Sequence, residues 1–341
     1  MNLCITGGGT GGHLMIAQAL LETAVKNGHN VIFIGSLKGQ DRRYFENEKA
    51  LKEVFFLDTT GVVNQKGIKK FVALFKVFKA FLKSRTILKE FKIDATYSVG
   101  GFSAAPASFA SLSKKIPLFI HEQNAVTGRL NSLLKPYSTN FISAYEPTCS
   151  IKGYPVKSLF LETSHVRKEL KTIIFLGGSH GAKAINDLAL SVASTLKQMG
   201  VRIIHQAGEN DFDRVKQQYE KLGVDAELYS FTTQLPELIN KSDFAISRAG
   251  ASTLWELSSN GCPAFYVPYP YAASNHQFYN AKFIVDGGMG WCVTEKEDLK
   301  NRLLDILKDL DLEEKSKKLL LHVEKDVAQK MIEDVEMRLK C

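Results

Sequence analysis

The chain has 341 residues, of which 45% are hydrophobic and 23% are charged, and its five cysteines include no C-x-x-C pair. This length exceeds what one hydrophobic core usually holds, so it predicts two globular domains. The scattered, odd-numbered cysteines exclude a disulfide framework and a paired-cysteine zinc site, and they favour a reducing cytoplasm.

The formal net charge of +8 is concentrated in one segment. Residues 66–92 contain nine lysines and arginines and one glutamate, so this segment carries the whole excess. The six residues before the first glycine are too short for a signal peptide, and no apolar run reaches 18 residues. We therefore expect neither secretion nor a membrane-spanning helix.

Short apolar runs alternate with amphipathic stretches along the chain, which is typical of a parallel α/β architecture. The predicted strands, in chain order, are residues 2–6, 30–34, 54–57, 95–99, 117–121, 140–143, 172–176, 202–206, 227–230, 244–247, 264–267 and 290–293. Predicted helices include residues 15–27, 184–199, 254–260 and 275–286, and the pattern beyond residue 309 predicts one charged helix.

Both halves open with a strand, a glycine turn and a helix, reading LCITGGGTGGH and IIFLGGSHGAKAIN. This repetition predicts two Rossmann-like units joined near the turn GYPVK at residues 153–157. A glycine turn at a helix N-terminus lets backbone N–H groups approach a phosphate. The alternative for each turn is close strand–helix packing without a ligand.

The first turn also satisfies the dinucleotide fingerprint G-x-G-x-x-G through Gly7, Gly9 and Gly12. A nicotinamide site further requires an acid about 20 residues on, at the end of the second strand. Ser36 or Leu37 occupies that place, which disfavours a dinucleotide oxidoreductase. His13 follows the turn and is either a structural hydrogen-bonding group or a general base, because its ordinary pKa lies near neutrality.

Glu256 stands out in the stretch ISRAGASTLWEL of the second half. It either forms a capping box with Thr253 or accepts hydrogen bonds from a ribose diol. The D-x-D pairs at residues 211–213 and 309–311 fall in polar surface segments, and the chain has no zinc-ligand spacing, so we expect no metal site.

The basic segment places five apolar residues at helical spacing, with lysines every seven residues on another face. Those apolar residues are Phe71, Leu74, Phe75, Phe78 and Leu82. One interpretation is a core-packed helix with a solvated lysine face. The other is a membrane-surface helix attracted by anionic headgroups, and the absence of a basic stripe elsewhere disfavours nucleic acid.

The motifs GGGTGGH, VGGF, HEQN, GGSHGA, SRAGAST and VPYPYAASNHQ occur in this order between Met1 and Ala281. Together they resemble the MurG family of peptidoglycan glycosyltransferases. The resemblance implies a GT-B fold, in which two Rossmann-like domains with parallel sheets face an interdomain cleft. Residues 1–156 would receive the lipid-linked acceptor, with a C-terminal helix at about 326–341 packing back on them, and residues 157–325 would bind the UDP-sugar.

The resemblance also implies site residues, with His13 as the catalytic base. The implied UDP-N-acetylglucosamine contacts are Thr10, Gly11, Gly12, Asn124, Lys157, Ser179, Thr232, Ala251, Ser252, Thr253, Leu254, Glu256 and Gln277. The implied membrane-associating residues are Lys69, Phe71, Phe75, Lys76, Phe78, Lys79 and Lys83. No metal or cofactor is implied beyond the nucleotide-sugar.

Three positions depart from the family pattern: Lys157 replaces an arginine and so loses a bidentate fork, Ile16 replaces a proline, and His180 replaces a glutamine. The implied reaction is inverting transfer of N-acetylglucosamine to the C4 hydroxyl of the muramyl unit of undecaprenyl-linked lipid I. It would form lipid II on the cytoplasmic face of the cell membrane, with the enzyme bound peripherally to anionic lipid. The alternatives are a non-hydrolysing UDP-sugar epimerase of the same fold, a dinucleotide oxidoreductase, and a non-catalytic phosphoinositide or nucleic-acid binder.

Overall fold

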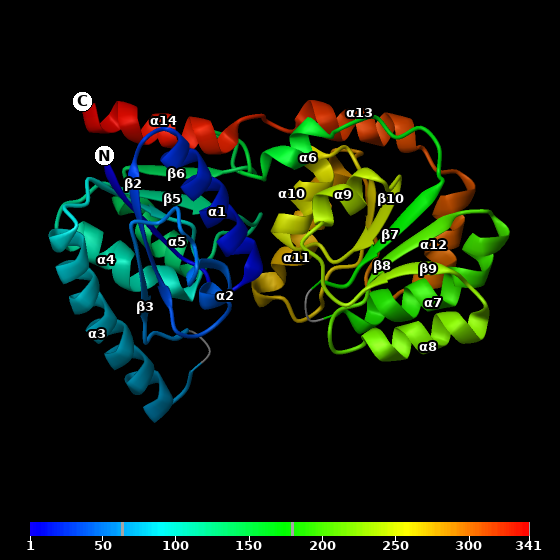
Figure 1. The fold of residues 1–341 in the computed structure, drawn as a ribbon, viewed down its shortest axis with the longest axis horizontal. Coiled ribbons are helices and arrows are strands. Elements are labelled where there is room, and N and C mark those ends of the chain that lie inside the picture. The colour runs from blue at the N-terminus through cyan, green and yellow to red at the C-terminus, as the bar shows by residue number, and fades with distance from the viewer. Residues whose placement is uncertain (63–64, 179–180, 341) are drawn as a thin grey trace. The chain divides into compact units, whose positions relative to one another are not determined.

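The computed structural model describes residues 1–62, 65–178 and 181–340 (Figure 1). The chain divides into two compact units. The first unit contains Met1–Val156 and the chain from Glu324 onward, and the second contains Lys157–Val323.

The first unit is built on a six-stranded parallel sheet in the order β3-β2-β1-β4-β5-β6. Its strands are β1 (Asn2–Thr6), β2 (Asn30–Ser36), β3 (Glu53–Leu57), β4 (Ala95–Ser98), β5 (Leu118–Glu122) and β6 (Asn140–Ser143). Its helices are α1 (Gly11–Lys26), α2 (Asp41–Phe45), α3 (Ile68–Glu90), α4 (Ala105–Ser113), α5 (Arg129–Leu134) and α14 (Val327–Lys340), with 3₁₀ turns at Phe102–Ala104 and Lys135–Tyr137. Every residue of β4 and β5 is buried, as expected of central strands of a parallel sheet that is covered on both faces.

The second unit repeats this arrangement with the strand order β12-β11-β10-β7-β8-β9. Its strands are β7 (Thr172–Leu176), β8 (Arg202–Gln206), β9 (Ala226–Tyr229), β10 (Phe244–Ser247), β11 (Ala264–Tyr266) and β12 (Trp291–Cys292). Its helices are α6 (Ser158–Glu162), α7 (Lys183–Gln198), α8 (Phe212–Leu222), α9 (Leu235–Asn240), α10 (Ala251–Ser259), α11 (His276–Asp286), α12 (Leu299–Lys308) and α13 (Leu312–His322), with a 3₁₀ turn at Ala273–Asn275. Both units therefore have the doubly wound Rossmann order, whose switch points lie between β1 and β4 and between β7 and β10.

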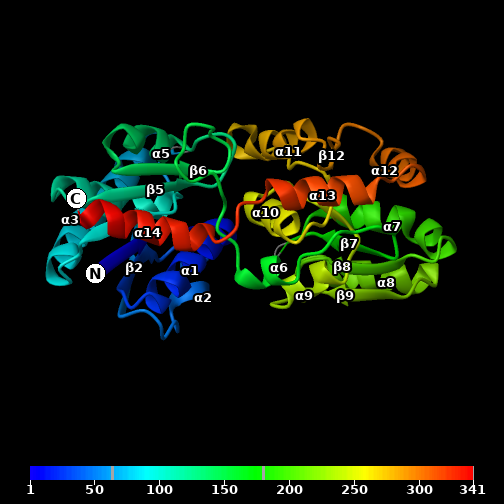
Figure 2. The same ribbon diagram turned by 90° about the horizontal axis from the view of Figure 1, so that it is seen from above.

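All the predicted strands are confirmed, with ends shifted by at most two residues. The prediction of one charged helix beyond residue 309 is wrong, because the chain breaks between α13 and α14. Val323 is extended (φ −77°, ψ 123°) and Asp326 is left-handed (φ 57°), and neither continues a helix. α13 stays in the second unit, whereas α14 packs along α1 of the first (Figure 2), where His29 Nε2 lies 2.7 Å from Glu336 Oε1.

The buried guanidinium of Arg167 connects several loops of the second unit by hydrogen bonds. Arg167 is 1% exposed and donates to the carbonyl oxygens of His165 at 2.8 Å, Ile239 at 3.2 Å and Ser242 at 3.2 Å. It also donates to the backbone and side-chain oxygens of Asn260. Arg167 thereby satisfies carbonyl groups at the C-terminal ends of both α9 and α10.

Candidate functional site

The first glycine turn, between β1 and α1, packs backbone to backbone against a second turn at Gly100–Gly101. Gly7 has φ 123°, and a Cβ atom at this position would lie 2.5 Å from Gly100 O. The Gly8 amide donates to Gly100 O at 3.1 Å. A side chain at Gly7 would separate the two turns, so the glycine is required here by close approach as well as by conformation.

Asp41 holds the first glycine turn in place, and sequence reasoning did not find it. Its buried carboxylate accepts hydrogen bonds from the amides of Gly9 at 2.6 Å and Ser36 at 2.7 Å. Burial raises the pKa of Asp41, and these hydrogen bonds oppose the rise. An acid therefore does follow the second strand, but it bonds to the backbone of the turn, as a loop anchor does.

His13 stands on the first turns of α1 with polar partners at both ring nitrogens. Its Nδ1 lies 2.8 Å from Thr10 Oγ1, and its Nε2 lies 2.8 Å from Gln123 Nε2. Gly11 and Gly12, also predicted to bind the donor, form the start of the same helix. Gln123 lies 110 residues further along the chain, at the end of β5. The structure thus places the predicted base, His13, against the predicted donor contact Thr10. It also places Gln123 there, which the HEQN motif did not distinguish from its neighbours.

The HEQN motif forms an anchored loop after β5. Glu122 accepts hydrogen bonds from the amides of Asn124 at 3.0 Å and Gly128 at 2.9 Å, and from Asn131 Nδ2 at 2.8 Å. Burial lowers the pKa of His121 to about 3, so this imidazole is neutral near pH 7. The carboxylate fixes the backbone at Asn124, the residue after Gln123, whereas His121 is not suited to proton transfer with a substrate.

The second glycine turn, between β7 and α7, is tied to the end of β8. The Gly177 amide donates to Gln206 O at 2.9 Å, and Gly181 is left-handed (φ 82°). Ser179, a predicted donor contact, lies outside the described residues, as does His180. The described part of the turn runs from the end of a strand to the N-terminus of a helix, as its sequence predicts.

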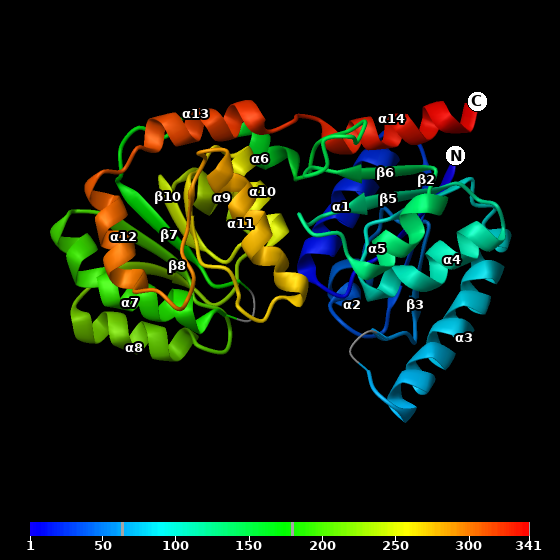
Figure 3. The ribbon, with the colours of Figure 1, turned by 180° about the vertical axis from the view of Figure 1, so that it is seen from behind.

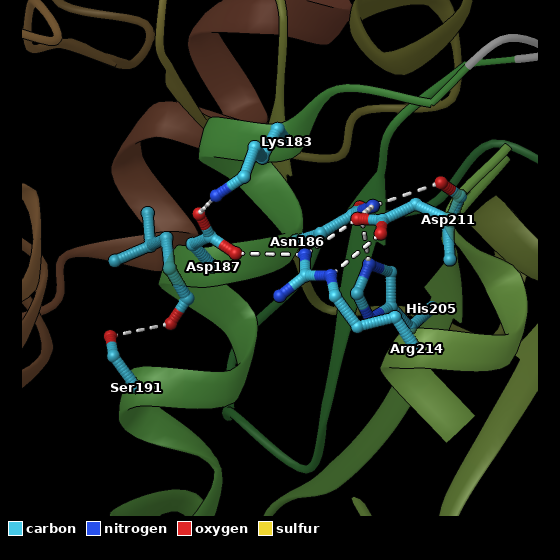
Figure 4. A network of polar contacts seen from close by, with 9 residues as sticks. Lys183, Asn186, Asp187, Ser191, His205, Asp211 and Arg214 are labelled. Atoms are coloured by element: carbon cyan, nitrogen blue, oxygen red, sulfur yellow. Dashed lines mark hydrogen bonds and ion pairs between the residues drawn. The ribbon is translucent and has the colours of Figure 1, made fainter. Parts of the chain in front are cut away.

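A polar network links α7, the end of β8 and the start of α8 (Figure 4). Asn186 Nδ2 donates to Ala207 O at 3.0 Å and to Asp211 Oδ2 at 2.7 Å, and Asn186 Oδ1 lies 3.0 Å from His205 Nε2. His205 Nδ1 lies 3.1 Å from the Tyr219 hydroxyl. Burial lowers the pKa of His205 to about 3, so the network contains a neutral imidazole.

At the protein surface, Arg214 joins this network by pairing with Asp211 and Asp187. Arg214 donates to both carboxylate oxygens of Asp211 at 2.6 Å and contacts Asp187 at 2.8 Å, and Asp187 also pairs with Lys183. The Arg214 guanidinium lowers the pKa of Asp211. Both carboxylates are used by these partners, and among the described residues no three His, Cys, Asp or Glu side chains gather as a metal site would require.

Glu256 lies on the second turn of α10 and is 5% exposed. Ser252 Oγ donates to Glu256 Oε1 at 2.7 Å, and burial raises the pKa of Glu256 while this hydrogen bond and the charge of Lys157 oppose the rise. The capping-box interpretation is wrong, because α10 begins at Ala251 after Gly250, so Thr253 lies inside the helix. A glycine before the helix leaves the N-terminal amides of α10 without a side-chain cap.

A cavity of about 80 Å³ lies at the carboxyl ends of β7, β8 and β10, at the switch point of the second sheet. Its lining residues are Leu176, Gly177, Gly178, Gln206, Leu235, Ser247, Arg248, Gly250 and Thr253. Ligands of open α/β sheets bind at such switch points. Of the predicted donor contacts, Thr253 lines the cavity directly, whereas Leu254 is buried and does not line it.

The other predicted donor residues lie on loops and a helix start of the second unit. Thr232 Oγ1 accepts the Gln234 amide at 2.9 Å in the turn before α9, and Gln277 Oε1 accepts the Tyr269 amide at 2.9 Å. Lys157 occupies the N-cap position of α6, where its side chain makes no capping hydrogen bond. None of these three residues lines the cavity. A ligand bound in the cavity could contact them only if it extended beyond the cavity.

Arg248 is a cavity residue that sequence reasoning missed. It donates to the carbonyl oxygens of Val267 at 3.0 Å and Pro268 at 3.3 Å, forms an ion pair with Glu295, and lies over the Tyr269 ring at 5.5 Å. These partners follow β11 and β12, so Arg248 cross-links three strand ends. The motif SRAGAST, which contains Arg248, was the feature of the sequence that could have identified it.

Helix α3 leaves an apolar stripe exposed, so the core-packed interpretation is wrong for this stripe. Phe71 is 75% exposed, Phe75 57% and Phe78 56%. The buried face is made of small and aliphatic residues, Ala73, Ala80, Ser84, Ile87 and Leu88, and it packs against α4 (Figure 3). A narrow face is enough to hold α3 against α4, because the small alanine and serine side chains allow the two helices to approach closely.

The lysines of α3 flank the exposed stripe. Lys79 Nζ lies 4.7 Å from the Phe75 ring centre, and Lys76 pairs with Asp58 at 2.7 Å. A cavity of about 250 Å³ beside the helix is lined by Lys38, Thr60, Gln65, Ile68, Lys69, Val72, Ala73 and Lys76. Within the described ranges, no helix is long and apolar enough to cross a membrane.

Comparison with known proteins places these features in a family. Residues 3–143 match the glycosyltransferase family 28 N-terminal domain, and residues 172–332 match the glycosyltransferase family 28 C-terminal domain. The chain is 62% identical over 341 residues, covering 100% of both sequences, to the UDP-N-acetylglucosamine–N-acetylmuramyl-(pentapeptide) pyrophosphoryl-undecaprenol N-acetylglucosamine transferase of Sulfurimonas denitrificans.

Solved structures give the same fold. The crystal structure of Acinetobacter baumannii MurG matches with a TM-score of 0.79 and 26% identity, covering 98% of this chain and 99% of that one. The UDP-GlcNAc 2-epimerase of Neisseria meningitidis matches with a TM-score of 0.62 and 15% identity, covering 99% and 100% of the two chains. The low identity of the epimerase limits that likeness to the fold, which is GT-B.

Proposed function

The chain belongs to glycosyltransferase family 28, and we propose that it transfers N-acetylglucosamine from UDP-N-acetylglucosamine to lipid I, forming lipid II for peptidoglycan synthesis. It is a hexosyltransferase. The observation that carries the proposal is the 62% identity to the Sulfurimonas denitrificans transferase over the full length of both chains. The site residues described above supply groups that this reaction needs.

The donor would be held by the second unit. Its diphosphate would meet the backbone amides of the turn at Gly177–Gly178 and the uncapped N-terminus of α10, which stabilise negative charge without a metal. Glu256 would accept hydrogen bonds from the ribose hydroxyls, in exchange for its bond from Ser252. Lys157, Thr232 and Gln277 would complete the donor contacts of this unit.

The acceptor would lose its proton to His13. The C4 oxygen of the muramyl unit would attack the anomeric carbon as the bond to UDP breaks, which inverts that carbon. Its proton would pass to the imidazole, and the departing UDP would carry the electron pair into the amides of the second unit. No step of this mechanism draws on a metal or another cofactor.

Helix α3 would bring the enzyme to its lipid-linked acceptor. Phe71, Phe75 and Phe78 expose apolar surface beside Lys69, Lys79 and Lys83, the pattern of a helix that lies in an anionic membrane interface. We infer that the protein binds peripherally at the cytoplasmic face of the membrane. A UDP-sugar epimerase acts on a water-soluble substrate and has no need of such a surface, so α3 favours the transferase.

Transfer of radiolabelled N-acetylglucosamine from its UDP donor to a lipid I analogue tests the proposal. The expected product is labelled lipid II, with no transfer from UDP-N-acetylgalactosamine. A parallel incubation without acceptor detects epimerisation of the donor. Epimerisation without any transfer would replace the proposed function by the epimerase.

A further inference from the structure

The cavity beside α3 lies at the same edge of the first sheet as the glycine turn that precedes His13. Lys38 follows the end of β2, Thr60 follows the end of β3, and both line this cavity. The loop of Lys38 reaches the glycine turn directly, because a Cβ atom on Gly39 would lie 2.7 Å from Gly9 Cα. Open α/β sheets bind ligands at the carboxyl ends of their strands. The cavity is therefore a neighbour of the predicted base within the same unit.

Hydrogen bonds fix the cavity wall that these two loops form. The Lys38 amide donates to Ser36 Oγ at 2.9 Å, and Ser36 Oγ donates to Thr59 O at 3.2 Å. Ser36 and Thr59 are both buried. The backbone that carries Lys38 and Thr60 is therefore fixed relative to the sheet.

The lining of the cavity has the charge of an anion site. Lys38, Lys69 and Lys76 line it, and among the described lining residues none is an aspartate or glutamate. Asp58 pairs with Lys76 at 2.7 Å from outside the lining and offsets one of the three charges. Two positive charges remain, and Thr60 adds a hydroxyl that can donate a hydrogen bond. A diphosphate diester, in which each phosphate carries one negative charge, matches this balance.

The α3 side of the cavity continues into the exposed apolar stripe. Ile68 and Val72 line the cavity and are 81% and 50% exposed. Phe71 and Phe75 lie three residues after them, on the adjacent surface of the helix. The volume of about 250 Å³ is below the range of about 300–1,000 Å³ for a site that holds a whole small-molecule ligand. The cavity therefore suits a phosphate-bearing group whose attached chain leaves over the apolar stripe.

We propose that this cavity binds the diphosphate of the lipid-linked acceptor, with Lys38 and Lys69 as acceptor-binding residues. The inference rests on the proposed transferase function. A pyranose carries its C1 and C4 substituents at opposite ends of the ring, so the diphosphate on C1 of the muramyl unit points away from the C4 hydroxyl at His13. The cavity adjoins the glycine turn through Gly39 and the apolar stripe through Ile68. Sugar, diphosphate and polyprenyl chain thus have successive places on one unit.

Acceptor kinetics of Lys38→Ala/Lys69→Ala test the assignment. A short-chain, water-soluble lipid I analogue removes membrane binding from the measurement. Loss of each charged donor should raise the KM for this acceptor about tenfold, and the double variant should raise it about 100-fold. The kcat and the KM for the donor should stay within about threefold of wild type, because the lysines contact neither the reacting atoms nor the donor. Lys89→Ala is the matched control, since Lys89 is an exposed lysine in the last turn of the same helix, outside the cavity lining.

Equilibrium binding without a donor tests the same contact independently of turnover. Fluorescence polarisation of dye-labelled analogues compares a diphosphate acceptor with a monophosphate acceptor of the same chain length. Wild type should bind the diphosphate analogue about tenfold or more tightly, because the second phosphate reaches a further lysine. Lys38→Ala/Lys69→Ala should bind the two analogues about equally.

Vesicle binding distinguishes the acceptor from a phospholipid as the source of the phosphate. Lys38→Ala should bind phosphatidylglycerol vesicles as wild type does, since Lys38 lies outside α3. Loss of this binding with an unchanged acceptor KM would assign the cavity to a phospholipid headgroup and overturn the proposal. A wild-type acceptor KM in the double variant, or an equal rise in Lys89→Ala, would also overturn it. Lysine-dependent binding of the analogue without transfer by wild type would instead overturn the proposed function alone.

Discussion

Replacing Phe71 and Phe78 by serine should weaken membrane binding. The two side chains are 75% and 56% exposed, so that much of each ring remains available to the bilayer. Full burial of a phenylalanine side chain is worth up to about 3 kcal/mol, so immersion of these fractions gives about 2 kcal/mol each. The pair therefore contributes up to roughly 4 kcal/mol, which is roughly a 1000-fold change in partition.

Co-sedimentation with vesicles measures this change. Vesicles of phosphatidylglycerol and phosphatidylcholine should retain wild type and release Phe71→Ser/Phe78→Ser, while transfer to a short-chain, water-soluble acceptor stays unchanged. Leu321→Ser is the control, because Leu321 is 87% exposed on α13 and lies outside the apolar stripe. Wild-type partition by the double variant, or an equal loss in Leu321→Ser, would refute the assignment of α3.

Four further predictions concern the site and the fold. His13→Ala should lower kcat about 100-fold in the lipid I assay, the scale of general-base loss. Glu256→Gln should raise the KM for the donor about tenfold or more in steady-state kinetics, because a charged acceptor of the ribose hydroxyls is lost. Arg167→Met should lower the free energy of unfolding by about 3 kcal/mol or more in urea denaturation, because several buried carbonyl groups lose their donor. The buried His205 has a pKa lowered to about 3, so the unfolded chain binds an additional proton below pH 6.5; wild type should therefore lose about 1.4 kcal/mol more stability per pH unit than His205→Gln as pH falls from 6 to 4.

Each of these predictions has an outcome that contradicts it. An unchanged kcat in His13→Ala would show that His13 is not the catalytic base. An unchanged KM for the donor in Glu256→Gln would show that Glu256 does not bind the ribose and serves only as the hydrogen-bond partner of Ser252. Equal urea midpoints for Arg167→Met and wild type would show that water replaces the guanidinium. For the pH series, His276→Gln is the control, since His276 is only half-buried and its ring bonds to Ala273 O at the surface. Parallel pH slopes in wild type and His205→Gln would exclude a buried neutral histidine as the cause.

The strands and the two glycine turns could be predicted because their signals are local. A parallel strand buried on both faces is mostly apolar, and a turn whose backbone contacts another turn needs glycine at the point of contact. The break between α13 and α14 could not be predicted in the same way. The charged pattern continues through Val323–Asp326, and the break arises because the chain leaves one unit and packs on α1 of the other.

The site was predictable as a set of motifs and not as a set of contacts. His13 was found from its position after a glycine turn, whereas its partner Gln123 lies 110 residues away and becomes recognisable only when β5 ends beside α1. Asp41 lies 32 residues from Gly9, whose amide donates to its carboxylate. Arg248 donates to the Val267 carbonyl in one later loop and pairs with Glu295 in another. Hydrogen bonds across such separations depend on how the strands are ordered in the sheet.

The sequence alone determined the two Rossmann-like units, the two glycine turns and the family, because each depends on residues that are neighbours in the chain. The tertiary structure decided which groups meet and which surfaces remain exposed. α3 shows the difference most clearly: its pattern of phenylalanines and lysines fitted both a core helix and a membrane-surface helix. Packing on α4 through alanine and serine uses only a narrow face, so the phenylalanine stripe remains in contact with solvent.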